Sequence, residues 1–360
     1  MSEKRFFRQI FDPALSYIGW TCAYTPEEAI YAAGLQPFRL LEFSPSTKMA
    51  DTHFHSNLCP YARNCLDFGL REKSQAFKGI VIVNSCDAMR CLFHSWIRDV
   101  STGRFVHLMD LPKVTSAAAV EYFAQEIRKL ICSLEAHFNC SITESSLAEA
   151  IDIYNETRDL MGEVYRLRSS ERFDVSETRI HKLVQASQTR PRKLFNRELK
   201  TFVEEIKKQE PEVPKPKRPR IMIVGSILPN PGLIEIIEEA GARIVFDDLC
   251  SGRRYFDARI EKEGDIARAL SRHYLLKAPC ARMKDTKLRM EMAEKQVEEH
   301  RIDGIVYNTM KFCDSDLYDY AAYHNVFRNK GVPIIQIEDD GAGGNAGQIK
   351  TRIEAFVEML

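Results

Sequence analysis

The sequence predicts an α/β protein with two doubly wound parallel-sheet lobes and a helical segment between them. Short apolar runs alternate with amphipathic stretches of helical spacing in residues 221–360, which is the pattern of a parallel sheet. Residues 1–115 show the same alternation less regularly, and residues 116–208 have helical spacing throughout. The length of 360 residues suits two α/β domains better than one.

Apolar runs in the N-terminal lobe predict three strands, and amphipathic stretches predict two helices. We expect the strands at 38–43, 79–84 and 105–109 and the helices at 26–33 and 89–100. Residues 116–210 follow as a helical insertion or connector. The N-terminal α/β lobe is therefore expected to span residues 1–115.

A proline-rich basic segment marks the next boundary. Residues 211–220 hold four prolines and four basic residues, a composition that favours extended, exposed chain and excludes a helix or a central strand. We interpret this segment as the linker to the second lobe, residues 221–360.

The C-terminal lobe shows the alternation clearly. The run 221–227 predicts a strand buried on both faces, followed by a Pro-Asn-Pro-Gly turn and a helix that ends at Gly241. Further strands are expected at 243–249, 303–307 and 333–337, and helices at 283–301, 317–329 and 346–360.

The charge and hydropathy of the chain argue against nucleic acid and membranes as partners. The 51 basic and 51 acidic residues balance, so no net field attracts polyanions. No apolar run approaches the ~20 residues that cross a bilayer, and the first ten residues lack the features of a secretory signal. We expect a soluble, cytoplasmic protein.

The ten cysteines are the feature that most needs a functional explanation. A reducing compartment argues against disulfides and leaves metal binding, catalysis or burial. The Cys-x-x-Cys spacing of a zinc ribbon is absent, because the closest pairs are five or six residues apart, Cys86 with Cys91 and Cys59 with Cys65. Thiolates are also the ligands of iron–sulfur clusters and copper(I).

Two of the cysteines occupy matching places in the two lobes. Cys86 follows the strand predicted at 79–84, Cys313 follows the strand predicted at 303–307, and an aspartate comes after each. Ligands of open α/β sheets bind beyond the carboxyl ends of the strands, so both thiols are candidate ligands that could share a site if the domains face each other. Burial of either cysteine as a small apolar side chain is the alternative. A third thiol, Cys59, lies in a polar loop that leads into a helix.

The segment after Cys22 has a structural and a catalytic interpretation. Thr25, Pro26 and Glu28 match a helix start in which Thr25 is the cap and Glu28 completes a capping box. The catalytic alternative makes the Glu28 carboxylate a base near the site.

Several motifs in order along the chain resemble the 2-hydroxyacyl-CoA dehydratase family, which includes the cluster-bearing subunits of benzoyl-CoA reductases and the double-cubane cluster proteins. The likeness covers nearly the whole chain. The matching stretches are Cys-Ala-Tyr-Thr-Pro-Glu-Glu from 22, Ala-Ala-Gly-Leu-Gln-Pro from 32, Cys-Pro-Tyr-Ala-Arg from 59, Ser-Cys-Asp-Ala-Met from 85, Asp-Asp-Leu-Cys-Ser-Gly-Arg-Arg-Tyr-Phe from 247, Lys-Phe-Cys-Asp from 311, Ile-Glu-Asp from 337 and Thr-Arg-Ile-Glu-Ala-Phe from 351.

The resemblance implies two flavodoxin-like (Rossmann-like) lobes with a cluster in the cleft between them. By position, Cys59, Cys86 and Cys313 correspond to the three ligands of a 4Fe-4S cluster, which leaves one iron open to substrate. Glu28 matches the family carboxylate proposed as the base, and Glu27 is the fallback. A low-potential electron from an ATP-hydrolysing activator with its own 4Fe-4S cluster would then drive elimination of water from an (R)-2-hydroxyacyl-CoA through a ketyl radical. A second, homologous subunit would form a heterodimer or homodimer with this chain.

Two further roles within the family remain open. The chain could be a component of an ATP-dependent reductase, acting on benzoyl-CoA or at a double-cubane cluster, or a non-catalytic electron-transfer partner subunit. Cys22 and Cys250 are possible additional ligands on which cluster size depends. The remaining cysteines have no motif support and are expected to be buried or neutral, namely Cys65, Cys91, Cys132, Cys140 and Cys280.

A glycine-rich run at 341–346 fits G-x-G-x-x-A between a predicted strand and a predicted helix. It lies too near the end of the sequence for a complete nucleotide-binding unit to follow. We interpret it as a helix-entry loop, with contact to a coenzyme A phosphate as the alternative.

Overall fold

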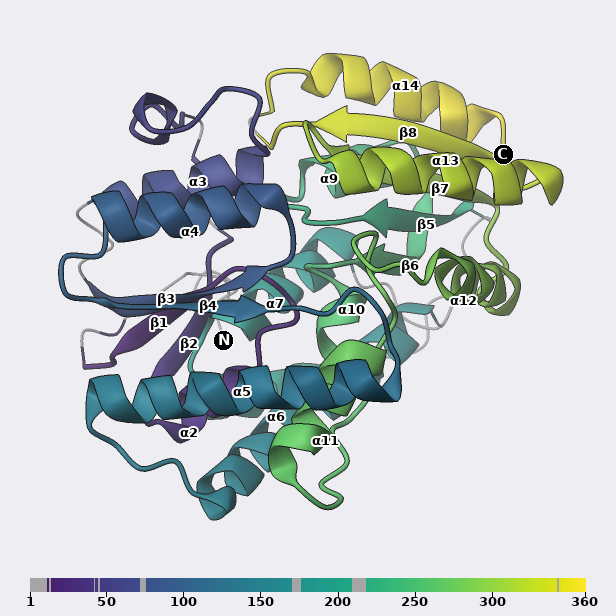
Figure 1. Cartoon of the computed structure of the whole chain (residues 1–360). Coiled ribbons are helices and arrows are strands. Elements are labelled where there is room, and N and C mark those ends of the chain that lie inside the picture. The colour runs from purple at the N-terminus through teal and green to yellow at the C-terminus, as the bar shows by residue number, and fades with distance from the viewer. Residues whose placement is uncertain are drawn as a thin grey trace. The chain divides into compact units, whose positions relative to one another are not determined.

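The computed structural model describes residues 12, 14–41, 43–44, 46–71, 76–169, 176–208, 218–341 and 343–360 (Figure 1). The chain divides into two compact units. The first comprises Met1–Asp159, Ala186–Glu198 and Asp257–Lys277, and the second comprises Leu160–Gln185, Leu199–Phe256 and Ala278–Leu360.

The first unit is built on a parallel sheet of four strands in the order β2-β1-β3-β4. The strands are β1 (Tyr17–Trp20), β2 (Gln36–Arg39), β3 (Phe77–Asn84) and β4 (Phe105–Asp110). Residues 80–83 of β3 are wholly inaccessible, as expected of an apolar run that is covered on both faces. The helices of this unit are α2 (Glu27–Ala32), η1 (Ala50–Thr52), α3 (Pro60–Leu70), α4 (Asp87–Asp99), α5 (Ala117–Phe138) and α11 (Ile266–Leu276).

Helices cover both faces of this sheet. Helices α3 and α4 lie on one face, and α2 and α5 lie on the other (Figure 1). Helix α11 packs along α5, and the Ser271 hydroxyl of α11 donates to the Val120 carbonyl of α5 at 2.6 Å. The chain after Phe256 thus returns to the first unit through α11.

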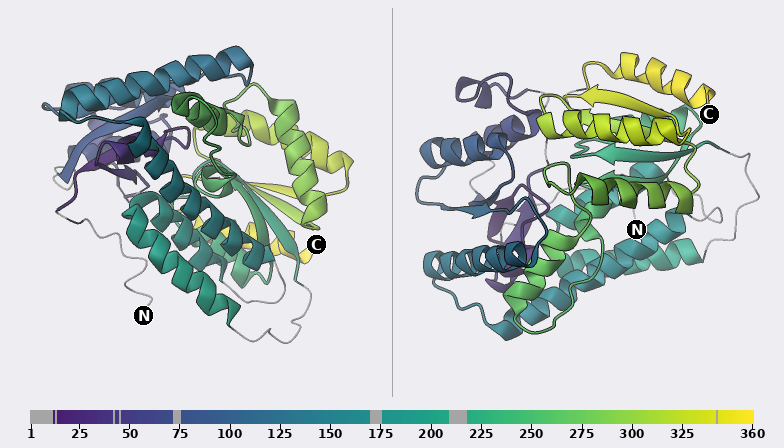
Figure 2. Two further views of the ribbon diagram at one scale, coloured as in Figure 1. Left: turned by 90° about the horizontal axis from the view of Figure 1, so that it is seen from below. Right: turned by 45° about the vertical axis from the view of Figure 1, so that its right-hand side comes forward.

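The second unit repeats the design with a parallel sheet in the order β6-β5-β7-β8. The strands are β5 (Arg220–Gly225), β6 (Arg243–Leu249), β7 (Gly304–Met310) and β8 (Ile334–Asp339). The helices that belong wholly to it are α9 (Gly232–Glu239), α10 (Arg253–Phe256), α12 (Thr286–Glu299), α13 (Asp314–Asn329) and α14 (Ala346–Glu358). Figure 2 shows this sheet between its covering helices.

Alternate residues of β5 belong to different halves of the core. Ile223 packs with Ile353 in the cluster formed with α9 and α14. Met222 and Val224 pack with Tyr323 in the cluster formed with α12 and α13. Since successive strand residues point to opposite faces, an uninterrupted apolar run is what a strand covered on both sides requires.

The structure confirms the predicted α/β class with two parallel sheets. The described residues form four strands in each sheet, one more than the sequence predicts for the first lobe. Within 116–208 the described residues form helices and no strand, with α6 (Glu144–Ser169), α7 (Glu177–Thr189) and α8 (Arg192–Lys207) after α5. Each of these three helices contributes residues to both units. The predicted domain boundaries stay predictions, and residues 211–217 of the predicted linker lie outside the described residues. No described helix is long and apolar enough to cross a membrane.

Candidate functional site

The three cysteines predicted as ligands share one local structure. Cys59 is the N-cap residue of α3, Cys86 that of α4 and Cys313 that of α13. None of the three side chains accepts a capping hydrogen bond from its helix. The partial positive charge at a helix N-terminus favours a thiolate over a thiol, so all three positions suit sulfur ligation.

Cys86 and Cys313 lie at corresponding points of the two sheets. Cys86 follows β3, which is third in the order of the first sheet, and Cys313 follows β7, which is third in the order of the second. Both thiols therefore lie beyond the carboxyl end of an inner strand, as predicted. Cys59 and Cys86 belong to the first unit and Cys313 to the second. The prediction that they share one site in a cleft between the lobes stays a prediction.

The chain around Cys313 has an unusual conformation. Phe312 has a φ of 59°, in the left-handed region that a bulky side chain rarely adopts, and its side chain is exposed. This turn brings the Cys313 amide to the Met310 carbonyl at 2.9 Å and buries the cysteine. Strained backbone of this kind is typical of functional sites.

The polar side chains of two residues contact Cys313. The Arg282 Nη2 atom lies 3.9 Å from Cys313 Sγ. Asp316 of α13 forms a hydrogen bond with Cys313 and with Ser226. Burial raises the pKa of Asp316, although these hydrogen bonds oppose the shift.

Two further cysteines of the second unit lie in the same neighbourhood. The Arg282 amide donates to Cys280 Sγ at 3.4 Å, and the Cys250 amide donates to the Ser226 carbonyl at 2.8 Å. The pKa of Arg254 lies above its ordinary value. Burial lowers this pKa, but the charge of Asp248 and, to a smaller extent, Cys250 and Cys280 raise it. Cys280 carries no sequence motif, so no local signal indicates this proximity, and only the fold brings it toward Cys250.

The first unit contains a thiol that is poorly suited to ligation. Cys65 is buried within α3, and this burial raises the pKa of its thiol. A thiol that holds its proton is a weak ligand, because metals bind the thiolate. This agrees with the expectation that Cys65 is structural.

Cationic side chains that suit an anionic group lie near thiols of the second unit, Arg282 beside Cys313 and Arg254 near Cys250 and Cys280. Within either unit taken alone, the described His, Cys, Asp and Glu residues form no group of three that could hold a metal ion. Arg254 is 4% exposed, and its Nη1 atom has no hydrogen-bond partner among the described residues. Buried N–H donors beside soft thiolates are the second-sphere groups that stabilise bound sulfide clusters.

Glu28 lies in a buried ionic network of the first unit. Its Oε1 atom is 2.6 Å from Arg158 Nη2, and its Oε2 atom accepts a 2.7 Å hydrogen bond from the Tyr274 hydroxyl. Burial, and then the charge of Glu28, raise the pKa of Tyr274 well above its ordinary value. Glu28 itself is fully buried. Glu27, the fallback base, is 3.0 Å from Arg192 and is also buried.

The capping box predicted for this helix is wrong. The N-cap residue of α2 is Pro26, and no side chain caps the helix. Thr25 Oγ1 is buried without a hydrogen-bond partner among the described residues. The Thr25 amide donates to the Cys22 carbonyl at 2.9 Å, and the Glu28 carboxylate pairs with Arg158 and Tyr274 instead. Contacts with residues distant in sequence, Arg158 and Tyr274, therefore determine where the Glu28 side chain lies, and the local capping pattern does not. Just before this helix, Lys277 Nζ donates to the Ala23 carbonyl at 2.5 Å and fixes the segment that carries Cys22.

The glycine-rich run leads into α14, as expected of a helix-entry loop. Its Gly341 carbonyl accepts from Asn230 Nδ2 at 3.0 Å, and Asn345 Nδ2 donates to the Glu338 carbonyl at 3.2 Å. Ala342 lies outside the described residues. Contact of this run with a coenzyme A phosphate stays a prediction.

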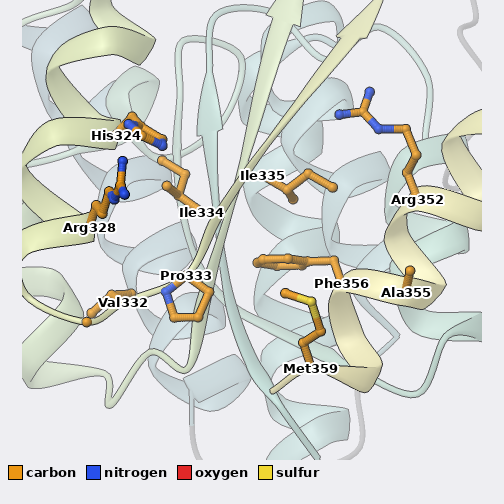
Figure 3. Close-up of a pocket in the computed structure, with 11 residues that line it drawn as sticks. His324, Arg328, Val332, Pro333, Ile334, Ile335, Arg352, Ala355, Phe356 and Met359 are labelled. Carbon is orange, nitrogen blue, oxygen red and sulfur yellow. The ribbon is translucent and has the colours of Figure 1, made fainter.

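A surface pocket of about 660 Å³ lies along the edge strand β8 of the second unit (Figure 3). Ile334, Ile335 and Phe356 form its apolar floor, and Arg328 and Arg352 lie on opposite sides of it. Arg352 also donates to the outward carbonyl of Gln336 at 2.7 Å, which covers part of the strand edge. Residues at the start of β8 line the pocket, whereas Cys313 lies beyond the opposite, carboxyl end of the sheet.

A protein-family model described as "2-hydroxyglutaryl-CoA dehydratase, D-component" matches residues 22–360. The chain belongs to this family. The match includes Cys59, Cys86, Cys313 and Glu28.

Individual members of the dehydratase family are similar along almost their whole length. The (R)-phenyllactyl-CoA dehydratase beta subunit of Clostridium sporogenes is 27% identical over 344 residues, which cover 95% of this chain and 91% of the relative. A benzoyl-CoA reductase subunit of Thauera aromatica is 26% identical over 357 residues, with 97% and 92% covered. The (R)-2-hydroxyglutaryl-CoA dehydratase subunit beta of Acidaminococcus fermentans is 24% identical over 352 residues, with 95% and 92% covered. Each of these relatives is named as a subunit of an enzyme.

Proposed function

We propose that this chain is an iron–sulfur subunit of a 2-hydroxyacyl-CoA dehydratase-type enzyme, with Cys59, Cys86 and Cys313 as cluster ligands. The observation that carries the proposal is the shared position of the three thiols, each at the N-cap of a helix. Family membership supports the assignment. The proposed cluster is a 4Fe-4S cluster.

When bound, such a cluster supplies a low-potential electron and an open iron position for the elimination of water from a 2-hydroxyacyl-CoA. The residues of the chain hold and shield it. Helix N-termini stabilise the thiolates, and Arg282 places positive charge beside Cys313.

Glu28 is the proposed base, with Glu27 as the alternative. The Glu28 carboxylate lies 2.6 Å from the Arg158 guanidinium, which fixes the position of one of its oxygens. The Tyr274 hydroxyl donates to the other carboxylate oxygen and is suited to orient it. For proton transfer, the substrate must reach this buried carboxylate directly or through Tyr274.

The proposed partners follow from the same assignment. The substrate is an acyl-CoA thioester, since the relatives are named as phenyllactyl-CoA, lactoyl-CoA and 2-hydroxyglutaryl-CoA dehydratase subunits. A second, homologous subunit forms the dimer with this chain, and an ATP-hydrolysing activator with its own 4Fe-4S cluster reduces it. We place the assembly in the cytoplasm.

An ATP-dependent reductase is the second candidate. Cys250 and Cys280 both raise the pKa of Arg254, so both lie near its guanidinium. The second unit therefore offers thiols beyond Cys313 for a larger cluster such as a double cubane. The similarity to a benzoyl-CoA reductase subunit supports this alternative. A non-catalytic electron-transfer subunit is the third.

Anaerobic purification followed by iron and sulfide analysis and electron paramagnetic resonance tests the proposal. About four irons for each chain support the single cluster, and about eight irons shared by a dimer support the double cubane. A chain that holds no iron when kept anaerobic throughout contradicts the proposal. Turnover of 2-hydroxyacyl-CoA with the activator and the partner subunit then separates dehydratase from reductase.

A further inference from the structure

We propose that Arg282 is a positioning residue that raises the reduction potential of the cluster bound through Cys313. This inference rests on the proposed function, because it assumes a cluster at that thiol. It assigns to Arg282 a role that depends on its charge and its contact with sulfur.

The geometry places Arg282 between two thiols. Its guanidinium lies 3.9 Å from Cys313 Sγ, and its backbone amide donates to Cys280 Sγ at 3.4 Å. The Met283 amide also donates to the Cys280 carbonyl at 2.9 Å, so the turn that carries Arg282 is closed on itself. The side chain therefore starts from a fixed backbone and reaches the Cys313 sulfur of the proposed ligand set.

Other residues hold this turn in place. The Pro279 carbonyl accepts from Arg289 Nη1 at 2.7 Å, and Arg289 forms buried ion pairs of 2.9 Å with both Asp248 and Asp319. These contacts hold the backbone of the turn and do not involve the Arg282 side chain.

The direction of the effect follows from charge. Reduction adds one electron to the cluster, and a nearby cation stabilises the more negative form more than the oxidised form. Hydrogen bonds to the sulfurs act in the same sense, and they are a recognised determinant of cluster potential. The Asp316 carboxyl also contacts Cys313, but it is common to wild type and variants and cancels from their comparison.

The test compares the reduction potentials of Arg282→Gln, Arg282→Lys and wild type. Anaerobic redox titration is followed by electron paramagnetic resonance, with iron measured in every sample. We expect Arg282→Gln to lower the ratio of reduced to oxidised cluster about tenfold at a fixed potential, which corresponds to ~59 mV for one electron. Arg282→Lys should restore part of this change because it keeps the charge but loses the planar donor group.

Lys284→Gln is the matched control, since it removes an exposed positive charge from the same loop. It should keep the wild-type potential. If Arg282→Gln loads poorly, Arg282→Met replaces it as the neutral variant. Full iron with an unchanged potential in a neutral variant overturns the role of Arg282 and leaves the proposed function standing. Absence of iron from the wild type overturns the proposed function itself.

Discussion

Arg158 Nη2 lies 2.6 Å from Glu28 Oε1, and both side chains are buried in the first unit. Because the Arg158 charge compensates the Glu28 carboxylate where water is absent, Arg158→Met leaves that carboxylate buried without its ion pair. We expect Arg158→Met to lower the free energy of unfolding by about 3–5 kcal/mol. Anaerobic urea unfolding measures this change.

The exposed pair of Lys193 and Glu149, 3.1 Å apart in the same unit, supplies the control. Lys193→Met should change stability far less than Arg158→Met, since solvent screens surface ion pairs. Equal effects of the two substitutions would contradict a buried, compensated role for Arg158.

Glu28→Gln separates the structural role of this carboxylate from its proposed role as base. The amide keeps the shape and can accept from Tyr274, but it cannot take a proton. If Glu28 is the base, turnover should fall by a factor of about 100 or more while iron content stays at the wild-type level. Turnover within a fewfold of wild type in a stable, iron-loaded variant would remove Glu28 from the mechanism and direct attention to Glu27.

Serine replacement tests the ligand set directly. Cys59→Ser, Cys86→Ser and Cys313→Ser should each lose cluster iron, because a hydroxyl is a poor substitute for a thiolate ligand. Cys132→Ser and Cys140→Ser are the controls and should retain it. Wild-type iron in any of the first three variants excludes that cysteine as a required ligand.

The regular part of the fold could be predicted from the sequence because local pattern determines it. The apolar run 243–249 corresponds to β6 (Arg243–Leu249), and the helix predicted at 346–360 corresponds to α14 (Ala346–Glu358). The strand β1 (Tyr17–Trp20) was missed because four residues that include Gly19 carry too little period-two signal. The predicted strand 38–43 lies instead at Gln36–Arg39, where a strand contains Pro37 at the edge of the sheet.

The site was predictable only in part. Cys86 and Cys313 follow apolar runs, so their positions after strands could be inferred from local sequence. The proximity of Cys280 to Arg254 could not, since it depends on tertiary packing of a loop that has no motif. The pairing of Glu28 with Tyr274 joins residues 246 positions apart, a separation that no local pattern records.

His181 should make the second unit sensitive to acid. Its side chain is buried in α7, and this burial lowers its pKa from 6.5 to about 4. The unfolded chain therefore binds a proton that the folded chain does not bind between these values, and stability is lost as the pH falls below 6.5. At about pH 5 this contribution is about 2 kcal/mol, since each pH unit is worth ~1.4 kcal/mol.

The measurement compares wild type with His181→Gln in urea at about pH 7 and about pH 5. The loss of stability on acidification should be smaller in the variant by roughly that amount. Glu177, whose pKa burial raises to about 7, acts in the opposite sense and is present in both proteins. An identical loss in both would show that His181 is not buried in its neutral form.

Gly79 should tolerate no side chain, because β3 and β4 approach closely there. A Cβ atom at this position would lie 2.2 Å from the Phe105 carbonyl oxygen and 2.5 Å from its Cβ atom. The obstructing atoms belong to the paired strand and cannot rotate away, so Gly79→Ala should destabilise the protein by about 1–3 kcal/mol.

Gly162→Ala in α6 is the matched control, since a Cβ atom there meets nothing within 4 Å. It should raise stability by up to ~1 kcal/mol, because alanine loses less backbone entropy than glycine in a helix. Thermal unfolding of both variants under anaerobic conditions measures the difference, and equal midpoints would refute the close approach of β3 and β4.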